Sequence, residues 1–254
     1  MVHRNKTALV TGASRGIGRA TALALAETGA HVLVHYGRSA REAESVVSEI
    51  QTKGGSANAI SADLGTPNGA ALLAKQALSI VGDRLDVLVL NAGISKGARI
   101  ADYTIEDFDN LFATNVRSPF FLVQQLLPVL GEGSNIVVIS SAAARTVAGK
   151  PALENPSLLA YASTKGAIET LVKHWAAILG PRGIRVNAVA PGVIDTDMSN
   201  FTKTEAGREV TLGMQALKRI GKPEDIADVV AFVASDGARW ITGASIPVDG
   251  GSKL

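Results

Sequence analysis

The chain has 254 residues, no cysteine and a formal net charge of +2, which excludes disulfides and thiolate metal sites and offers no basic stripe for nucleic acid. No proline-rich, serine-rich or charged linker divides it, and its length fits one large α/β domain. No run reaches the roughly 20 apolar residues of a membrane helix, and no apolar signal core begins the chain. We therefore expect one domain over residues 1–254, located in the cytoplasm, with no metal, membrane or nucleic acid as a partner.

Residues 6–25 are typical of a short strand, a glycine turn and a helix. Residues 8–10 form an apolar run suited to a buried parallel strand, and Gly12, Gly16 and Gly18 punctuate the turn that follows. Glycines at such a turn let backbone N–H groups approach a pyrophosphate at a helix N-terminus, where negative charge is favoured. The spacing is G-x-x-x-G-x-G and not the commoner G-x-G-x-x-G. The residues alone therefore leave open either a dinucleotide site or a plain tight turn.

Residues 31–36 predict the second strand, whose end faces the adenosine ribose in a dinucleotide-binding fold. An acid at that end would bond the 2′-hydroxyl of NAD, but the chain continues with Gly37, Arg38 and Ser39. An arginine at this corner accommodates the 2′-phosphate of NADP, and Arg15 adds a second charge. The sequence therefore favours NADP(H) over NAD(H), with ordinary surface arginines as the alternative.

Polar or small residues follow the later predicted strands at their carboxyl ends, where ligands bind in open α/β sheets. These residues are Asp63 and Leu64 after 57–62, Asn91, Ala92 and Gly93 after 85–90, Ser140 and Ser141 after 135–139, and Pro191 and Gly192 after 183–190. Helical patterns cover residues 40–53, residues from 104 and from 119, the segment around 161–179 and residues 223–234, and a last strand is predicted within 244–251. Alternating strands and helices predict a parallel sheet covered on both faces.

A polar residue continues the apolar stripe of the helix that begins near Thr104. Thr104 is a plausible N-cap with Asp107 three residues on. The stripe expected to face inward is Ile105, Phe108, Leu111 and Phe112. The next position on that face is Asn115, and a buried asparagine should be hydrogen-bonded. A structural bond to a neighbouring strand and a role in the site are both open.

Tyr161 and Lys165 stand four residues apart, so they share one helix face. An ammonium group near a phenol stabilises the phenolate, so we expect Lys165 to lower the pKa of Tyr161 toward neutrality. That shift would make Tyr161 a usable acid and base. A tyrosine–lysine pair alone is usually a surface contact, and the assignment depends on its neighbours in the fold.

Residues 195–221 lack a continuous core stripe but carry several large apolar side chains. We expect this segment to form a lid over the substrate, and an ordinary surface helix pair is the alternative. The histidines have no metal-ligand spacing and are expected to be structural: His3, His31, His35 and His174.

Taken together, these residues resemble the classical short-chain dehydrogenase/reductase family, and the resemblance extends over nearly the whole chain. The matching residues are Thr11 to Gly18, Asp63, Asn91 to Gly93, Asn115, Ser141, Tyr161 to Lys165, Pro191, Gly192 and Thr196. The glycine spacing that looked unusual is that family's own form. The resemblance implies a Rossmann-type, doubly wound, seven-stranded parallel sheet flanked by helices, a homotetramer and NAD(P)-dependent oxidation or reduction at a CH–OH carbon.

The resemblance also implies a role for each matching residue. Tyr161 is the general acid and base, Ser141 polarises the substrate oxygen, Lys165 holds the nicotinamide ribose and lowers the pKa of Tyr161, and Asn115 orders a water in the proton relay. The implied cofactor-binding set is Gly12, Ser14, Arg15, Gly16, Ile17, Gly18, Arg38, Ser39, Asp63, Leu64, Asn91, Ala92, Gly93, Tyr161, Lys165, Pro191, Gly192, Ile194 and Thr196.

One departure from the family concerns the substrate. Tyr161 follows Ser141 by 20 positions, which is more than is usual, and the extra residues within 142–160 would border the substrate. The leading hypothesis is a carbonyl reductase similar to the 3-oxoacyl-[acyl-carrier-protein] reductases. The alternatives are a sugar or polyol dehydrogenase of the same family and a non-catalytic dinucleotide-binding sensor.

Overall fold

The computed structural model describes residues 6–147 and 152–252. Its centre is a seven-stranded sheet of order β3-β2-β1-β4-β5-β6-β7, in which every neighbouring pair is parallel. The strands are β1 (Thr7–Val10), β2 (His31–Tyr36), β3 (Ser56–Ser61), β4 (Val87–Leu90), β5 (Asn135–Ile139), β6 (Arg185–Pro191) and β7 (Ser245–Val248). The chain steps from β1 outward to β3 and then back past β1 to β4, so the order reverses beside β1.

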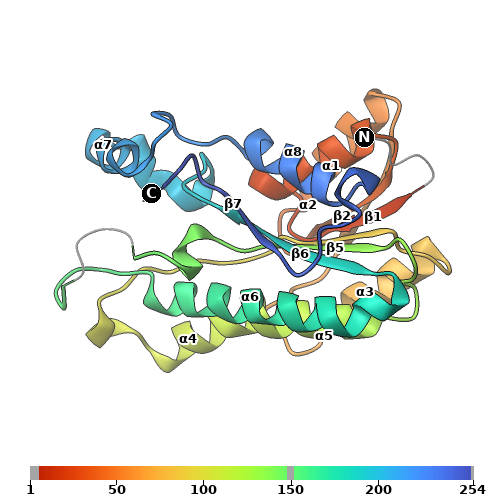
Figure 1. Cartoon of the computed structure of the whole chain (residues 1–254), viewed down its shortest axis with the longest axis horizontal. Helices are drawn as coiled ribbons and strands as arrows, with labels where there is room; N and C mark the ends of the chain where they lie inside the picture. The colour runs from red at the N-terminus through yellow and green to blue at the C-terminus, as the bar shows by residue number, and fades with distance from the viewer. Residues whose placement is uncertain (1–5, 148–151, 253–254) are drawn as a thin grey trace.

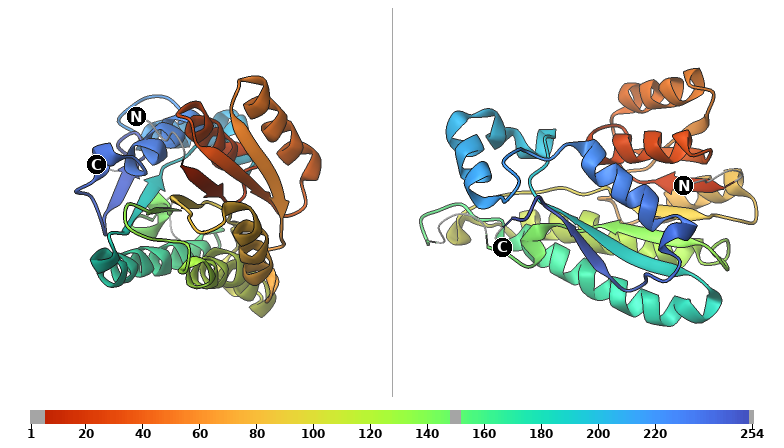
Figure 2. Two further views of the ribbon diagram at one scale, coloured as in Figure 1. Left: turned by 90° about the vertical axis from the view of Figure 1, so that its right-hand side faces the viewer. Right: turned by 45° about the horizontal axis from the view of Figure 1, so that its top comes forward.

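Helices cover both faces of the sheet, as Figures 1 and 2 show. The α-helices are α1 (Gly16–Glu27), α2 (Ala40–Thr52), α3 (Gly69–Val81), α4 (Ile105–Phe112), α5 (Ser118–Leu126), α6 (Leu159–Leu179), α7 (Glu205–Met214) and α8 (Pro223–Val233). Strand residues alternate between two apolar cores because successive side chains point to opposite faces. Leu9 and Leu88 pack toward α3, α5 and α6, and Val10 and Val89 pack toward α1, α2 and α8. The doubly wound parallel sheet predicted from the sequence is confirmed.

The region between α4 and α5 corrects the predicted apolar stripe. Thr104 is the N-cap of α4 and accepts a hydrogen bond from the Asp107 backbone N–H, as predicted. However, Ile105 and Phe108 are 83% and 45% exposed. Hydrophobic spacing identifies the apolar face of a helix but does not show whether another element covers that face. In α4, only Leu111 is buried. A π-helical turn over Ala113–Arg117 then joins α4 to α5 and carries Asn115 into the interior.

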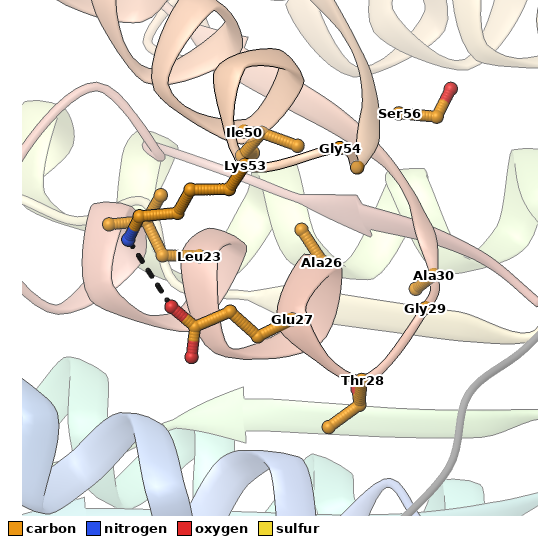
Figure 3. A pocket seen from close by; sticks show the side chains of 11 residues that line it. Leu23, Ala26, Glu27, Thr28, Gly29, Ala30, Ile50, Lys53, Gly54 and Ser56 are labelled. Atoms are coloured by element: carbon orange, nitrogen blue, oxygen red, sulfur yellow. Dashed lines mark hydrogen bonds and ion pairs between the residues drawn. The ribbon is translucent and has the colours of Figure 1, made fainter.

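The carboxyl ends of the strands and their amino ends form two distinct edges of the sheet. The predicted site residues follow the carboxyl ends, whereas a cavity of about 540 Å³ lies at the other edge, against the C-terminal turns of α1 and α2 (Figure 3). Lys53 reaches across this cavity to Glu27. The cavity contains none of the predicted site residues. Among the described residues, no helix is both long enough and apolar enough to cross a membrane.

Candidate active site at the carboxyl edge of the sheet

The glycine turn after β1 is packed too closely for any side chain at Gly18. A Cβ there would collide with the Gly12 carbonyl oxygen and lie 2.5 Å from Asn91 Nδ2. Asn91 Nδ2 occupies that space because it donates to the carbonyl oxygens of Thr11 (2.8 Å) and Gly12 (3.1 Å). Gly12 and Gly16 have φ of 64° and 55°, a region that favours glycine. The glycine spacing therefore lets α1 start directly against the ends of β1 and β4.

His35 is hydrogen-bonded to this turn. The sequence predicted a structural role for His35 but did not indicate this partner. Its Nδ1 accepts a hydrogen bond from the Gly12 backbone N–H at 3.0 Å, and its Nε2 lies 3.0 Å from the Ala62 carbonyl oxygen. An accepting Nδ1 requires the neutral ring with its proton on Nε2. Burial lowers the pKa of His35 to about 4, against the opposing effect of the Ala62 carbonyl. The ring is therefore neutral near pH 7, as this geometry needs.

Two arginines stand beside the glycine turn and the end of β2. Arg15 is the N-cap residue of α1, whose first turn has no capping side chain and no acid. Arg15 Nη1 lies 3.6 Å from Asp197 Oδ2, and Arg38 Nη2 lies 3.4 Å from Asp63 Oδ2. Both arginine side chains are mostly exposed. This corner therefore combines the positive end of a helix dipole with two cations whose present partners are exposed carboxylates.

The remaining predicted residues of this corner lie around the same turn. Ser14 is buried and Ile17 packs against the core under α1, Ser39 is the N-cap of α2, and Leu64 is buried after β3. Asp63 Oδ1 accepts from the Gly65 backbone N–H at 3.0 Å, which forms a local turn. Asp63 therefore stabilises the loop after β3 through this bond.

Asn115 and Lys165 converge beneath Gly93. A Cβ at Gly93 would lie 3.3 Å from Asn115 Oδ1 and 3.7 Å from Lys165 Nζ. Asn115 Oδ1 accepts from the Ile94 backbone N–H (2.9 Å), and its Nδ2 donates to the Ile94 carbonyl oxygen (2.9 Å) and to Thr164 Oγ1 (3.1 Å). Asn115 is therefore hydrogen-bonded, as a buried asparagine should be, but its partners are the loop after β4 and helix α6 and not a neighbouring strand.

Tyr161, Ser141 and Lys165 meet where β5 ends and α6 begins. Both Tyr161 and Lys165 are buried, and Lys165 Nζ lies 5.6 Å from the centre of the Tyr161 ring. Lys165 Nζ donates to the Ile139 carbonyl oxygen at 2.8 Å. The Tyr161 side chain is hydrogen-bonded to that of Ser141. The segment 142–160 leaves Ser141 through a short 3₁₀ turn, Ala142–Ala144, whose first free N–H the Ser141 hydroxyl caps.

The electrostatics of this cluster correct the predicted tyrosine shift. Burial raises the pKa of Tyr161 above its ordinary value, and the hydrogen bond with Ser141 only partly opposes that rise. Burial also lowers the pKa of Lys165 to about 8. The expected lowering assumed an ammonium group that outweighs desolvation, but here Lys165 is itself desolvated and is directed to a backbone carbonyl. Tyr161 is therefore held as the neutral phenol at pH 7.

The end of β6 leads directly into the predicted lid. Gly192 N donates to the Val248 carbonyl oxygen at 3.1 Å, after Pro191 ends the strand. Ile194 is buried, and Thr196 starts a 3₁₀ segment, Asp197–Lys203, that precedes α7. A Cβ at Gly16 would lie 3.3 Å from Thr196 Cγ2. The first residues of 195–221 therefore rest on the glycine turn.

A family model described as enoyl-(acyl carrier protein) reductase matches residues 12–253. The chain belongs to the short-chain dehydrogenase/reductase family. Among curated relatives, it is 42% identical to the versicolorin reductase StcU of Emericella nidulans, over 97% of this chain and 95% of that protein. It is 41% identical to the 3-oxoacyl-[acyl-carrier-protein] reductase FabG of Staphylococcus epidermidis, over 98% and 100% of the two chains.

Solved structures of similar proteins extend these relationships. The angucycline C-6 ketoreductase LanV with bound NADP is 40% identical, with a TM-score of 0.91 over 99% of this chain and 97% of that one. A short-chain dehydrogenase from Burkholderia cenocepacia in complex with NADP is 36% identical, with a TM-score of 0.92 over both whole chains. The protein is thus an NAD(P)-dependent oxidoreductase of this family, acting on CH–OH or keto groups.

The residues around the glycine turn and the N-terminus of α1 suit the binding of a dinucleotide, as expected in this family. The α1 N-terminus leaves its first-turn N–H groups without a side-chain cap, and the contacts around Gly18 leave no room for a side chain in that turn. Two threonines that belong to the matching motifs, but to which the sequence assigned no role of their own, complete the scaffold. Thr11 Oγ1 accepts from the backbone N–H groups of Asn91 and Ala92, both at 2.9 Å, and Thr164 receives Asn115. Their place inside the matched motifs was the signal in the sequence, and their hydrogen-bond partners came from the structure.

Proposed function

We propose that the protein is an NADP(H)-dependent reductase of ketones. The observation that carries this proposal is the convergence of Asn115, Ser141, Tyr161 and Lys165 at the strand ends that also hold the glycine turn. The nicotinamide, when bound, supplies or takes the hydride, and the protein supplies position and electrostatics. A dinucleotide-binding sensor would not need this set of side chains.

Each side chain has a role that follows from its contacts. Tyr161 donates its phenolic proton to the carbonyl oxygen of the substrate, and Ser141 donates a hydrogen bond to the same oxygen. Lys165 holds the ribose hydroxyls and stabilises the phenolate that Tyr161 leaves behind. Asn115, fixed by the Ile94 backbone and Thr164, orients a water that returns the proton.

The raised pKa of Tyr161 favours the reductive direction. A general acid must carry its proton at working pH, and burial keeps Tyr161 protonated. Lys165, with its pKa lowered to about 8, carries its charge near pH 7 and becomes neutral in mildly alkaline solution. Alcohol oxidation needs the tyrosinate as a base, so it should require a higher pH than ketone reduction.

Arg15 and Arg38 support a preference for NADP(H). Both are exposed cations, Arg15 in the glycine turn and Arg38 just after β2, and no acid stands at the end of that strand to compete for a ribose hydroxyl. A 2′-phosphate would receive charge-assisted hydrogen bonds from these guanidinium groups. The relatives solved with NADP bound are consistent with this preference.

The substrate that we favour is a ketone with an apolar body, as in 3-oxoacyl thioesters. Ile94, Met198 and Phe201 are exposed on segments that leave the site, after β4 and within the predicted lid. Such a border suits an acyl chain or a ring system better than a polyol, which needs many hydrogen-bond partners. The relatives named as 3-oxoacyl and versicolorin reductases support a keto substrate.

We further propose that residues 195–221 act as the substrate lid, and that the protein is a cytoplasmic homotetramer. The expected subunit contacts are the helices over 112–130 and 157–179, which carry exposed Phe120, Phe121 and Ile178. Apolar side chains gathered on neighbouring helices are typical of a covered face. Sedimentation would test this assembly, and a clean monomer would refute it.

Substituting Tyr161 tests the proposed function. Tyr161→Phe should lower the rate of ketone reduction at least about a hundredfold while NADPH binding is unchanged, because only the proton donor is lost. The assay panel should contain a 3-oxoacyl thioester, an aromatic polycyclic ketone, and a sugar and a polyol, with NADPH and NADH in turn. Lys173→Met, on the exposed side of α6, is the matched control. An unaffected rate in Tyr161→Phe would overturn the assignment, and turnover of the polyol alone would favour the dehydrogenase alternative.

A further inference from the structure

Glu169 lies on α6 one turn beyond Lys165 and two turns beyond Tyr161, so the three residues share a helix face. Its carboxylate is only 13% exposed and accepts three side-chain hydrogen bonds. Oε1 accepts from Ser140 Oγ at 3.1 Å and from Ser245 Oγ at 2.7 Å, and Oε2 accepts from Arg145 Nε at 2.8 Å. A largely shielded carboxylate with three side-chain donors links its partners to α6.

The three partners come from three different parts of the fold. Ser140 follows β5, Arg145 follows the 3₁₀ turn Ala142–Ala144, and Ser245 begins β7. Ser141 lies between the first two, as the N-cap of that turn. Glu169 therefore holds the chain on both sides of Ser141, one residue before it and four residues after it.

The network ties these flanks to the helix that carries Tyr161. Arg145 also donates from Nη2 to the Ser245 carbonyl oxygen at 3.4 Å, which closes the junction on its outer side. Hydrogen bonds with an ionised partner are stronger than neutral ones. If the carboxylate is removed, Ser140 and Ser245 lose their acceptor and Arg145 loses its counter-ion. The 3₁₀ turn then keeps its backbone bonds, the Ser141 cap and the long Arg145 bond to the Ser245 carbonyl, but it loses its side-chain link to α6.

We propose that Glu169 is a positioning residue that fixes the Ser141 hydroxyl against Tyr161 by clamping both flanks of Ser141 onto α6. The inference rests on the proposed function, because it assigns Ser141 and Tyr161 to the same substrate oxygen.

Substitutions at Glu169 separate positioning from substrate binding. Glu169→Ala should lower kcat by about 10- to 100-fold, since small displacements of a catalytic group have effects of this size. KM and the NADPH dissociation constant should change less than about twofold, because Glu169 touches neither ligand. Glu169→Gln should recover most of the rate, since its carbonyl can accept from Arg145 and its amide can donate to a serine hydroxyl.

A double-mutant cycle with Ser141→Ala tests whether Glu169 acts through Ser141. Positioning predicts that Glu169→Ala lowers kcat strongly when Ser141 is present and less than about twofold when Ser141 is already alanine. Equal fold losses in both backgrounds would overturn the inference. Glu49→Gln is the matched control, because Glu49 joins α2 to α1 through Arg19, pairs with Lys53 at the end of its own helix, and has no contact with the Ser141 region.

A spectroscopic form of the same cycle does not depend on turnover. The protein has three tyrosines, so fluorotyrosine labelling gives few ¹⁹F resonances, and Tyr161→Phe assigns that of Tyr161. Glu169→Ala should move this resonance further in the Ser141 protein than in the Ser141→Ala protein, because the hydrogen bond between Ser141 and Tyr161 carries the change. An equal shift in both backgrounds would overturn the inference even if no substrate were turned over. If the unsubstituted protein turned over no substrate of the panel, that result would count against the proposed function and not against the role of Glu169.

Discussion

The imidazole of His35 accepts a hydrogen bond from the backbone N–H of Gly12, at 3.0 Å. Gly12 begins the glycine turn, and His35 lies near the end of the neighbouring strand β2. Because the ring must be neutral to accept this bond, protonation and an intact turn are mutually exclusive. The stability of the fold is thereby linked to pH through one buried residue.

We predict that stability falls as pH decreases from about 6.5 toward about 4. The pKa of His35 is lowered from 6.5 to about 4 by burial, so the unfolded chain binds the proton at a higher pH than the folded one. The contribution of neutral His35 to the free energy of unfolding is complete above pH 6.5. It is lost between pH 6.5 and about 4, and the loss amounts to about 3 kcal/mol. Denaturant unfolding from about pH 7 to about pH 4 measures it.

His35→Gln is the informative variant for this pH dependence. The glutamine amide can accept from Gly12 and donate to the Ala62 carbonyl without titrating. Its unfolding free energy should therefore depend less on pH over this window than that of the parent. His31→Gln, on the same strand, is the control and should retain the parent slope. A parent slope that persists in His35→Gln would contradict the prediction.

We expect Gly18→Ala to destabilise the protein by about 1–3 kcal/mol, as overpacking does. The added Cβ would collide with the Gly12 carbonyl oxygen and press on Asn91 Nδ2. Gly166→Ala is the matched control, because a Cβ at Gly166 in α6 meets no atom within 4 Å outside its own helix turn. That substitution should stabilise by up to about 1 kcal/mol. Thermal unfolding of both variants measures these changes. A Gly18→Ala protein as stable as the parent would show that the glycine turn can shift to accommodate the added methyl group.

Removing Arg15 and Arg38 together should reduce the preference for NADPH over NADH by about 10- to 100-fold, which corresponds to losing charged hydrogen bonds. NADH affinity should be nearly unchanged, since it lacks the phosphate. Fluorescence titration with both cofactors gives the ratio. Arg41→Ala, on the neighbouring helix α2, should keep the parent ratio. Equal NADPH and NADH affinities in the parent protein would refute the proposed preference.

Hydrogen exchange tests residues 195–221 as a lid. We expect exchange over the 3₁₀ segment Asp197–Lys203 and α7 to slow when NADP⁺ and an unreactive ketone analogue bind together, because closure protects backbone amides. The buried helix α8 serves as the internal reference. If both regions respond alike, or if neither responds, the segment is an ordinary pair of surface helices.

The sheet was predictable because its strands are short, almost wholly apolar runs bounded by turn residues. The second and fifth strands were predicted with the bounds that they have, and the fourth and sixth shift by one or two residues at their ends. No element was predicted over Gly69–Val81, which forms α3. Its sequence is apolar on most sides and has no marked stripe, so a periodicity argument does not detect it.

The site illustrates what motif spacing leaves undetermined. Asn115 was placed on an inward face by regular helical spacing, but the chain reaches that position through a π turn, which spacing does not foresee. The shift in the pKa of Tyr161 was predicted in the wrong direction. The spacing of Tyr161 and Lys165 indicates that they lie close together, but it does not indicate how deeply both are buried. The partners of Glu169 lie up to 76 positions away in sequence, beyond any local pattern.

The contact of Thr196 with the glycine turn has a kinetic consequence. Thr196 is the second residue of the predicted lid and lies against the space over Gly16, while its neighbour Asp197 is paired with Arg15. A dinucleotide phosphate that binds Arg15 would have to compete with Asp197. If residues 195–221 form the proposed lid, the base of the lid would then move before any ketone is enclosed. We therefore expect compulsory-order kinetics, in which the dinucleotide enters first and leaves last, and product-inhibition patterns would reveal that order.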